Sequence, residues 1–86
     1  MYVIITYDVA KERVTKINAF LKRFLFWVQN SVFEGEIRQT NLEKVKKGLS
    51  RLIKESDSIR IYKLTSPSQV KVEILGKKKD ATSRIL

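Results

Sequence analysis

Asp8 is the residue of this sequence with the clearest capacity for chemistry. It ends the run "YVIITYD", whose β-branched and aromatic residues predict a strand over residues 2–8. A carboxylate there can ligate Mg²⁺ or Mn²⁺, but such ions need several oxygens, so a second copy of Asp8 across a two-fold axis would have to join it. Two close carboxylates repel and need a cation or a shared proton between them. On the residues alone, a side chain that caps the amides of residues 10 and 11 is the favoured alternative.

Basic residues follow Asp8 closely. Lys11, Arg13 and Lys16 surround the start of a predicted helix, where cations oppose the helix dipole. This position suggests phosphate contacts, in which cations and free amides act together, with a solvated helix face as the alternative. Lys77, Lys78 and Lys79 lie in a basic turn that can bind phosphate nonspecifically.

The composition limits the possible classes of protein. The chain has 86 residues, 18 Lys and Arg against 9 Asp and Glu, no cysteine and no histidine. Disulfides, thiolate and histidine metal sites, and Ser-His triads are therefore excluded. The charge of +9 favours nucleic acid as partner over an anionic membrane, with a charged thermophile-like surface as the alternative. No apolar stretch is long enough for a membrane helix or a signal peptide, so we expect a cytoplasmic protein.

Hydrophobic periodicity assigns the main elements. Near-continuous apolarity over residues 2–8 predicts a central strand buried on both faces. Apolar residues at helical spacing from Val14 to Val28 predict an amphipathic helix. Thr40 and Glu43 form a capping-box pattern that opens a second helix, continuing to residue 53. Residues 59–64 and 70–75 read as further strands.

The segment 27–38 leaves two possibilities open. It is either one long strand or two short strands bent around Asn30–Ser31. Gln29 and Ser31 are polar residues in this extended segment and need partners, so together with Phe33 they are candidates for the bend or for a dimer interface.

With the bent pair, the chain is an α+β protein with the ferredoxin-like βαββαβ order, a two-layer sandwich with an extra C-terminal strand. Residues 1–76 would form the domain, and 77–86 a basic tail that could exchange a strand with a dimer partner. Both helices would cover one face of the sheet. The bare apolar face of so small a domain predicts a homodimer.

Several motifs together resemble a known family. "YVIITYDV" at 2–9, "KERVTK" at 11–16, "WVQNSVFEGEI" at 27–37 and "DSIRIYKL" at 57–64 are similar to the small CRISPR-associated adaptation protein that partners the spacer integrase. The resemblance implies a ferredoxin-like homodimer with Asp8 near the two-fold axis as the metal-binding and catalytic residue. It implies Mg²⁺ or Mn²⁺ as cofactor, and Lys11, Arg13 and Lys16 as backbone contacts.

The resemblance also implies a role, which leaves two functions open. The first is a dimeric scaffold that bridges integrase dimers and binds the backbone of double-stranded DNA. The second is a metal-dependent endonuclease acting on RNA or double-stranded DNA. A stand-alone endoribonuclease, or a toxin-like nuclease of the same fold, is the alternative biological setting.

Overall fold

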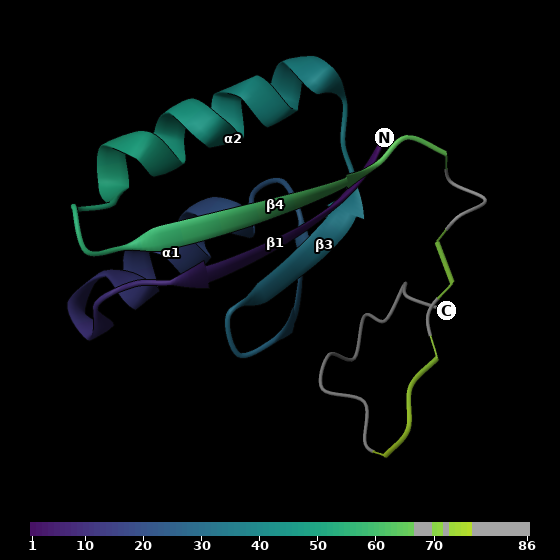
Figure 1. The fold of residues 1–86 in the computed structure, drawn as a ribbon, viewed down its shortest axis with the longest axis horizontal. Coiled ribbons are helices and arrows are strands. Elements are labelled where there is room, and N and C mark those ends of the chain that lie inside the picture. Colours follow the sequence, from purple (N-terminus) through teal and green to yellow (C-terminus); the bar gives the residue numbers. More distant parts are fainter. Residues whose placement is uncertain (67–69, 72, 77–86) are drawn as a thin grey trace.

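The chain folds into one antiparallel sheet covered by two helices (Figure 1). The computed structural model describes residues 1–66, 70–71 and 73–76. Its elements are, in chain order, β1 (Tyr2–Asp8), the 3-10 helix η1 (Lys11–Arg13), α1 (Val14–Leu21), β2 (Phe26–Gln29), β3 (Val32–Glu36), α2 (Gln39–Leu52) and β4 (Ser58–Leu64). The strand order β2-β3-β1-β4, with antiparallel neighbours, confirms the predicted ferredoxin-like βαββαβ fold.

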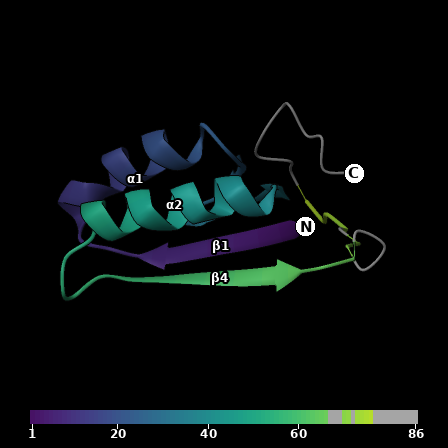
Figure 2. The ribbon, with the colours of Figure 1, turned by 90° about the horizontal axis from the view of Figure 1, so that it is seen from above.

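β1 is the central strand, but only one of its faces is buried in the chain. Val3, Ile5 and Tyr7 point into the core, whereas the alternate residues between them are half-buried. The prediction of burial on both faces is therefore wrong for the single chain. The reason is that α1 and α2 lie together on one face of the sheet (Figure 2).

The core lies between that face and the helices. Ile5 faces Phe33 of β3 on one side and Ile61 of β4 on the other. The buried apolar residues are Val3, Ile5, Tyr7, Ile17, Leu21, Leu25, Phe33, Ile37, Leu42, Val45 and Leu49. Phe33 is fully buried among them and pairs with Trp27 next to the β2–β3 bend, so it is a core residue and is not exposed for a dimer interface.

α1 is shorter than its periodicity predicted. It ends at Leu21, where Phe24 and Leu25 both donate their backbone N–H to the Leu21 carbonyl. The predicted extension to Val28 is wrong, since residues 26–29 form β2 and pair with β3 instead. The apolar and aromatic residues there suit a strand better than a helix, and the sheet decides between the two.

The bend between β2 and β3 confirms the two-strand reading of 27–38. Asn30 adopts a positive φ of 41°, a conformation that asparagine tolerates better than most residues. Trp27 Nε1 donates to the Asn30 carbonyl at 3.0 Å. The register then shifts between Trp27 and Gln29, which leaves Gln29 exposed at the edge of the sheet.

Two further predictions fail. Thr40 does not cap α2, because the helix already begins at Gln39. Its N-cap residue is Arg38, which makes no side-chain capping hydrogen bond. Gln39 Nε2 instead donates to Glu43 Oε2 at 2.9 Å. Residues 70, 71 and 73–75 do not form the predicted strand, and Leu75 is 95% exposed. The tail 77–86 lies outside the described residues.

Candidate metal and nucleic-acid site

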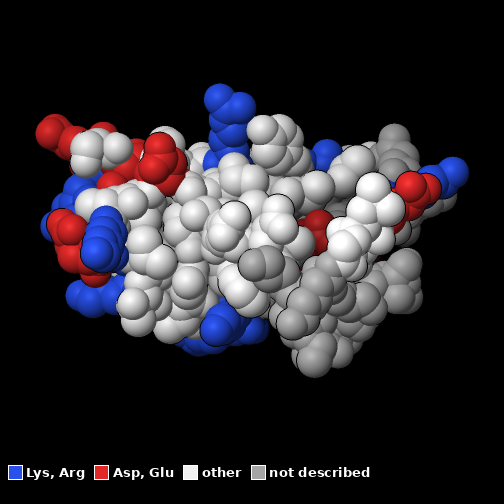
Figure 3. Space-filling view, turned by 90° about the horizontal axis from the view of Figure 1, so that it is seen from below, with Lys and Arg blue, Asp and Glu red and all other residues white. Residues whose placement is uncertain are grey.

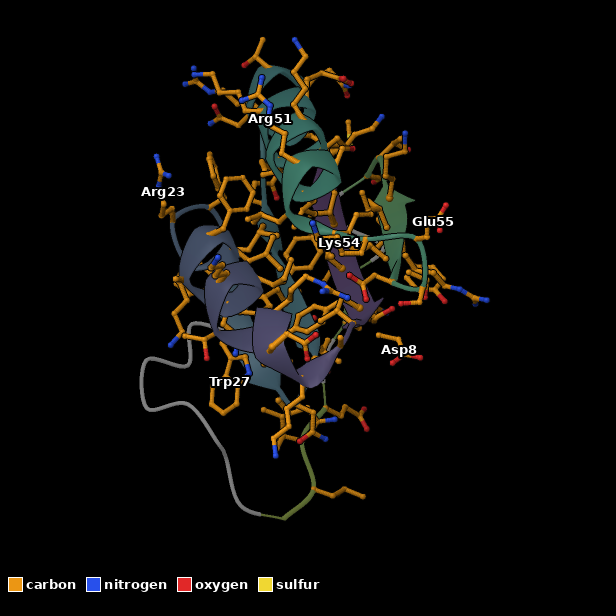
Figure 4. All side chains as sticks on the ribbon, turned by 90° about the vertical axis from the view of Figure 1, so that its left-hand side faces the viewer. Asp8, Arg23, Trp27, Arg51, Lys54 and Glu55 are labelled. Atoms are coloured by element: carbon orange, nitrogen blue, oxygen red, sulfur yellow. The ribbon has the colours of Figure 1, made fainter. Side chains whose placement is uncertain are left out.

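Asp8 lies at the carboxyl end of β1, opposite Ser58 of β4, and its side chain is exposed. Alternation along β1 places it on the face away from the helices, in line with Ile4 and Thr6. Figure 4 shows the Asp8 side chain beyond the end of the strand, pointing into open space. The carboxylate is therefore available to a ligand or to a second copy of the chain.

The face that Asp8 borders is not covered by either helix. Figure 3, which views the molecule from the side opposite α2, shows a broad central area largely free of charge, with most charged groups at its margin. The strand registers place on this face Tyr2, Ile4, Thr6, Val32, Glu34, Glu36, Ser58, Arg60, Tyr62 and Leu64. Tyr62, which is 48% exposed, adds a large aromatic side chain on edge strand β4, beside Ile4 of the central strand β1. We call this set of residues the open face.

Lys11 and Lys16 stand beside Asp8 in the chain, and both side chains are exposed. Lys11 belongs to η1 and Lys16 to the first turn of α1. Their cations are thus free to meet a polyanion at this end of the sheet. Lys77, Lys78 and Lys79 lie outside the described residues.

Arg13 differs from these lysines. Its side chain is only 15% exposed, and its Nε and Nη2 donate to Asp57 Oδ2 and Oδ1 at 2.5 and 2.8 Å. This two-pronged hydrogen bond uses the guanidinium edge that would otherwise bind a phosphate. Arg13 is therefore a structural residue, and we correct its prediction as a nucleic-acid contact.

Asp57 was missed in the sequence and organises this end of the molecule. Its side chain is 1% exposed and accepts, besides Arg13, the backbone N–H of Ala10 at 3.0 Å and of Lys54 at 2.8 Å. The Arg13 guanidinium and these amides hold the pKa of Asp57 well below its usual range, and Asp57 raises the pKa of Arg13. The segment just after Asp8 is thereby tied to the α2–β4 loop.

The same contacts take one of the two amides that the residues alone assigned to an Asp8 cap, and η1 has no side-chain cap at its N-cap residue. The amide of residue 10 is taken by Asp57, which arrives from 47 residues further along the chain. The cluster "ESDS" signalled only a turn. Its Asp is a common turn residue because the side chain can accept a nearby backbone amide, as Asp57 does from Lys54. No local pattern names Arg13 as the distant partner.

Tyr7 links the neighbouring buried side of β1 to two other elements. Its hydroxyl donates to Asn18 Oδ1 of α1, and its backbone N–H donates to the Ser31 carbonyl at 3.1 Å. Burial raises the pKa of the Tyr7 phenol, while side-chain hydrogen bonds with Ser31 and Asn18 act in the opposite direction. Ser31 thus does bridge the bend, to the strand that carries Asp8.

The oxygens of one chain do not complete a site for Mg²⁺. Among the described residues, no three acidic side chains come together. Asp8 alone supplies at most two carboxylate oxygens, whereas Mg²⁺ prefers six ligands. Mg²⁺ on one chain would therefore keep most of its water ligands, and a second copy of Asp8 would add the further carboxylate that holds the ion more firmly.

These features define a small, basic ferredoxin-like protein with an open sheet face and an exposed carboxylate at its border. The model of the family described as CRISPR associated protein Cas2 matches residues 1–72. The chain belongs to the Cas2 family. In the described part of the chain, no helix is both long and apolar enough to cross a membrane.

Relatives and solved structures agree with this membership. A Pyrococcus furiosus protein named CRISPR-associated endoribonuclease Cas2 is 48% identical over 88 residues, covering 100% of both chains. One from Thermodesulfovibrio yellowstonii, named CRISPR-associated endoribonuclease Cas2 3, is 46% identical over 99% of this chain and 98% of its own. A crystal structure of Cas2 has a TM-score of 0.83 and 43% sequence identity, and the match covers 92% of this chain and 90% of that chain. The crystal structure of Streptococcus pyogenes Cas2 has a TM-score of 0.76 and 36% sequence identity, and the match covers 88% of this chain and 100% of that chain.

Proposed function

We propose that this chain is the dimeric CRISPR adaptation subunit that binds the backbone of double-stranded DNA and bridges integrase dimers during spacer acquisition. The observation that carries the proposal is the open face, an uncovered sheet surface bordered by Asp8 in a chain of net charge +9 that belongs to the Cas2 family. The face supports pairing of two copies. The charge supports a polyanionic partner.

The dimer follows from apolar surface left in water. Tyr62 and Phe26 are 48% and 39% exposed, and beyond β4 Ile74 and Leu75 are 44% and 95% exposed. Burial of such area contributes about 25 cal/mol per Å², so a second copy that covers it adds stability to a domain of only 86 residues. Exchange of the C-terminal segment between copies would also cover Ile74 and Leu75.

Binding of DNA would rest on cations at the Asp8 end. Lys11 and Lys16 are exposed there and neutralise backbone phosphates, releasing counterions. Lys77, Lys78 and Lys79 would add to this attraction. Contacts of this kind carry no sequence information, as a subunit that handles varied DNA fragments requires.

A divalent cation belongs to the same proposal. Two Asp8 side chains brought together by the dimer would repel unless a cation such as Mg²⁺ or Mn²⁺ lay between them. When bound, the cation would neutralise phosphate charge. Asp8 would hold it, while the Asp57–Arg13 pair fixes the backbone that follows Asp8.

A second function, an Asp8-dependent endoribonuclease, is favoured by the printed names of the relatives from P. furiosus and T. yellowstonii. Because the chain has no histidine, it lacks the commonest general base. Asp8 at the end of β1 is the residue on which such an activity would depend.

Binding and cleavage measured side by side separate the two functions. Double-stranded DNA and single-stranded RNA are each offered to the wild type, to Asp8→Asn and to Glu55→Gln, an exposed control at the same end of the molecule (Figure 4). Each is assayed with Mg²⁺, with Mn²⁺ and with EDTA, alone and with the integrase subunit.

The scaffold function predicts DNA binding that survives Asp8→Asn and weakens steeply with salt. The ribonuclease function predicts cation-dependent RNA cleavage that disappears in Asp8→Asn and persists in Glu55→Gln. Absence of DNA affinity at low salt, with and without the integrase, would contradict the scaffold. Cleavage that persists in Asp8→Asn would point to a contaminant.

A further inference from the structure

A hollow of about 410 Å³ lies at the end of the sheet opposite Asp8, and arginines dominate its charge. It is formed where the turn after α1 meets the connection from β3 to α2. Arg23 and Phe24 contribute from the turn. Glu36 contributes from the end of β3, Arg38 from the connection and Asn41 from the first turn of α2. Its volume is sufficient for a phosphate group with part of a nucleotide.

The charges of this hollow are not balanced by the residues that the structure describes. Arg23 and Arg38 both have exposed side chains, and neither forms an ion pair with any residue that the structure describes. Glu36 is the acidic residue of the lining, and its carboxylate pairs with the amino group of Met1 at 3.1 Å. Two guanidinium groups therefore face one hollow without a carboxylate partner.

Arg23 is held in place by aromatic rings. Its guanidinium carbon lies 5.9 Å from the centre of the Phe20 ring and 5.6 Å from that of Phe24, and the two ring centres are 5.5 Å apart. Contact with ring faces positions a guanidinium without using its N–H donors. Arg23 is in this way preorganised to donate to an anion, which lowers the entropy cost of binding.

We propose that Arg23 and Arg38 form a second phosphate-binding site for nucleic acid, at the end of the sheet opposite Asp8. The proposal rests on the proposed nucleic-acid binding. Phosphate fits the paired donor edge of arginine, and the chain's charge of +9 favours nucleic acid over an acidic protein as its source. The Asn41 side chain in the same hollow adds an amide donor.

Salt dependence of binding tests the site. The variant Arg23→Gln/Arg38→Gln is compared with Lys44→Gln/Lys47→Gln, which removes the same charge from exposed positions on α2 outside the hollow. We expect the slope of log K against log salt to become shallower by about 2 for the arginine pair, about 1 for each lost phosphate contact, and clearly less for the lysine pair. Equal changes in the two variants would overturn the site.

Two further arms keep the result interpretable. Arg38→Gln alone leaves the Phe20 and Phe24 contacts intact and should lower the slope by about 1 without changing the melting temperature. Duplexes with a 5′-phosphate and with a 5′-hydroxyl distinguish the source of the phosphate. If the arginine variants lose affinity only for the 5′-phosphorylated duplex, the site binds a terminal phosphate. If they lose affinity equally for both duplexes, the site binds a backbone phosphate.

A titration with inorganic pyrophosphate separates this site from the proposed function. The Nε–Hε signals of Arg23 and Arg38 should shift together and saturate, while that of exposed Arg51 on α2 does not. Such shifts in a protein that fails to bind DNA would leave the site standing and remove the proposed function. If the protein binds DNA but shows neither these pyrophosphate-induced shifts nor the slope difference, the site is overturned and the proposed function stands. An acidic protein segment would then be the partner of this surface.

Discussion

Arg13 and Asp57, 44 residues apart in the chain, are joined by two hydrogen bonds of 2.5 and 2.8 Å. The pair connects the 3-10 helix that follows Asp8 to the loop between α2 and β4. Because the Asp57 side chain is 1% exposed and also accepts two backbone amides, it fixes both segments at once. Asp8 thus extends into solvent from a backbone that is rigid immediately after it.

Replacement of Asp57 by Asn should destabilise the fold. The substitution leaves Arg13 with only the exposed Glu12, 3.6 Å away, as a charge partner, and weakens the acceptor for the amides of Ala10 and Lys54. We expect the melting temperature, followed by circular dichroism at pH 7, to fall by about 5 °C or more. Glu55→Gln, in the same loop but exposed, is the control and should change it little. An Asp57→Asn protein as stable as the wild type would show that the pair is not a structural link.

The pH dependence of stability should carry the same signature. The pKa of Asp57 is lower in the folded than in the unfolded protein, so its contribution is complete above the unfolded pKa of about 4 and is lost as pH falls below it. The difference in melting temperature between the wild type and Asp57→Asn should therefore be constant from pH 7 to 5 and shrink between pH 4 and 2. A difference that stays constant down to pH 2 would contradict the ionised pair.

The sequence predicted those parts of the fold that depend on local pattern. The β-branched run of residues 2–8 predicts β1, and the segment 27–38 predicts a bend at Asn30–Ser31 as one of two possibilities. Helix ends were less accessible, because the residues after Leu21 keep helical spacing while their pairing with β3 makes them a strand. Competition between local periodicity and a distant strand partner cannot be resolved from spacing alone.

The candidate site divides in the same way. Asp8, Lys11 and Lys16 lie within nine residues of each other in the chain, so they can be predicted together, and all three are exposed. Arg13 looked like one of them, and only the approach of Asp57 in three dimensions separates it. The hollow with Arg23 and Arg38 likewise depends on the packing of two loops, so neither residue carried a signal in the sequence.

Gly48→Ala should destabilise the protein although alanine favours helices. A Cβ atom at Gly48 would lie 2.2 Å from Cζ of Phe20, so the ring must move. Overpacking costs about 1–3 kcal/mol and the helix gains about 1 kcal/mol, which leaves a net loss of about 1 kcal/mol in the free energy of unfolding measured with urea.

The control is Ser50→Ala, on an exposed position of the same helix, which should change that free energy by less than about 0.5 kcal/mol. Since Phe20 also lies under Arg23, the Arg23 Nε–Hε signal should shift in Gly48→Ala and not in Ser50→Ala. A stabilised Gly48→Ala protein with an unshifted signal would mean that Phe20 relaxes without cost.

Tyr62→Glu should break the proposed dimer. Tyr62 of edge strand β4 pairs with Ile4 of β1 on the open face. A carboxylate there would be desolvated in the dimer, with Arg60, whose Nη1 lies 3.3 Å from the Tyr62 hydroxyl, as its one nearby cation among the described residues. We expect the wild type to sediment as a dimer and Tyr62→Glu to dissociate at least about tenfold more readily, a change of about 1.4 kcal/mol. Lys63→Gln, the neighbouring residue with the same change in net charge, should remain dimeric.

The same variant tests whether the cation requires both copies of Asp8. If two carboxylates hold one Mn²⁺, Tyr62→Glu should lose Mn²⁺ affinity measured by calorimetry although its own Asp8 is unchanged, and Asp8→Asn should lose it while remaining a dimer. Mn²⁺ binding that is equal in the Tyr62→Glu monomer and the wild type would assign the ion to a single chain. A Tyr62→Glu protein that stays dimeric would place the interface on another surface. The two variants separate dimer formation from ion binding. Tyr62→Glu keeps Asp8 but moves the second copy away, whereas Asp8→Asn keeps the dimer but removes the charge of both carboxylates.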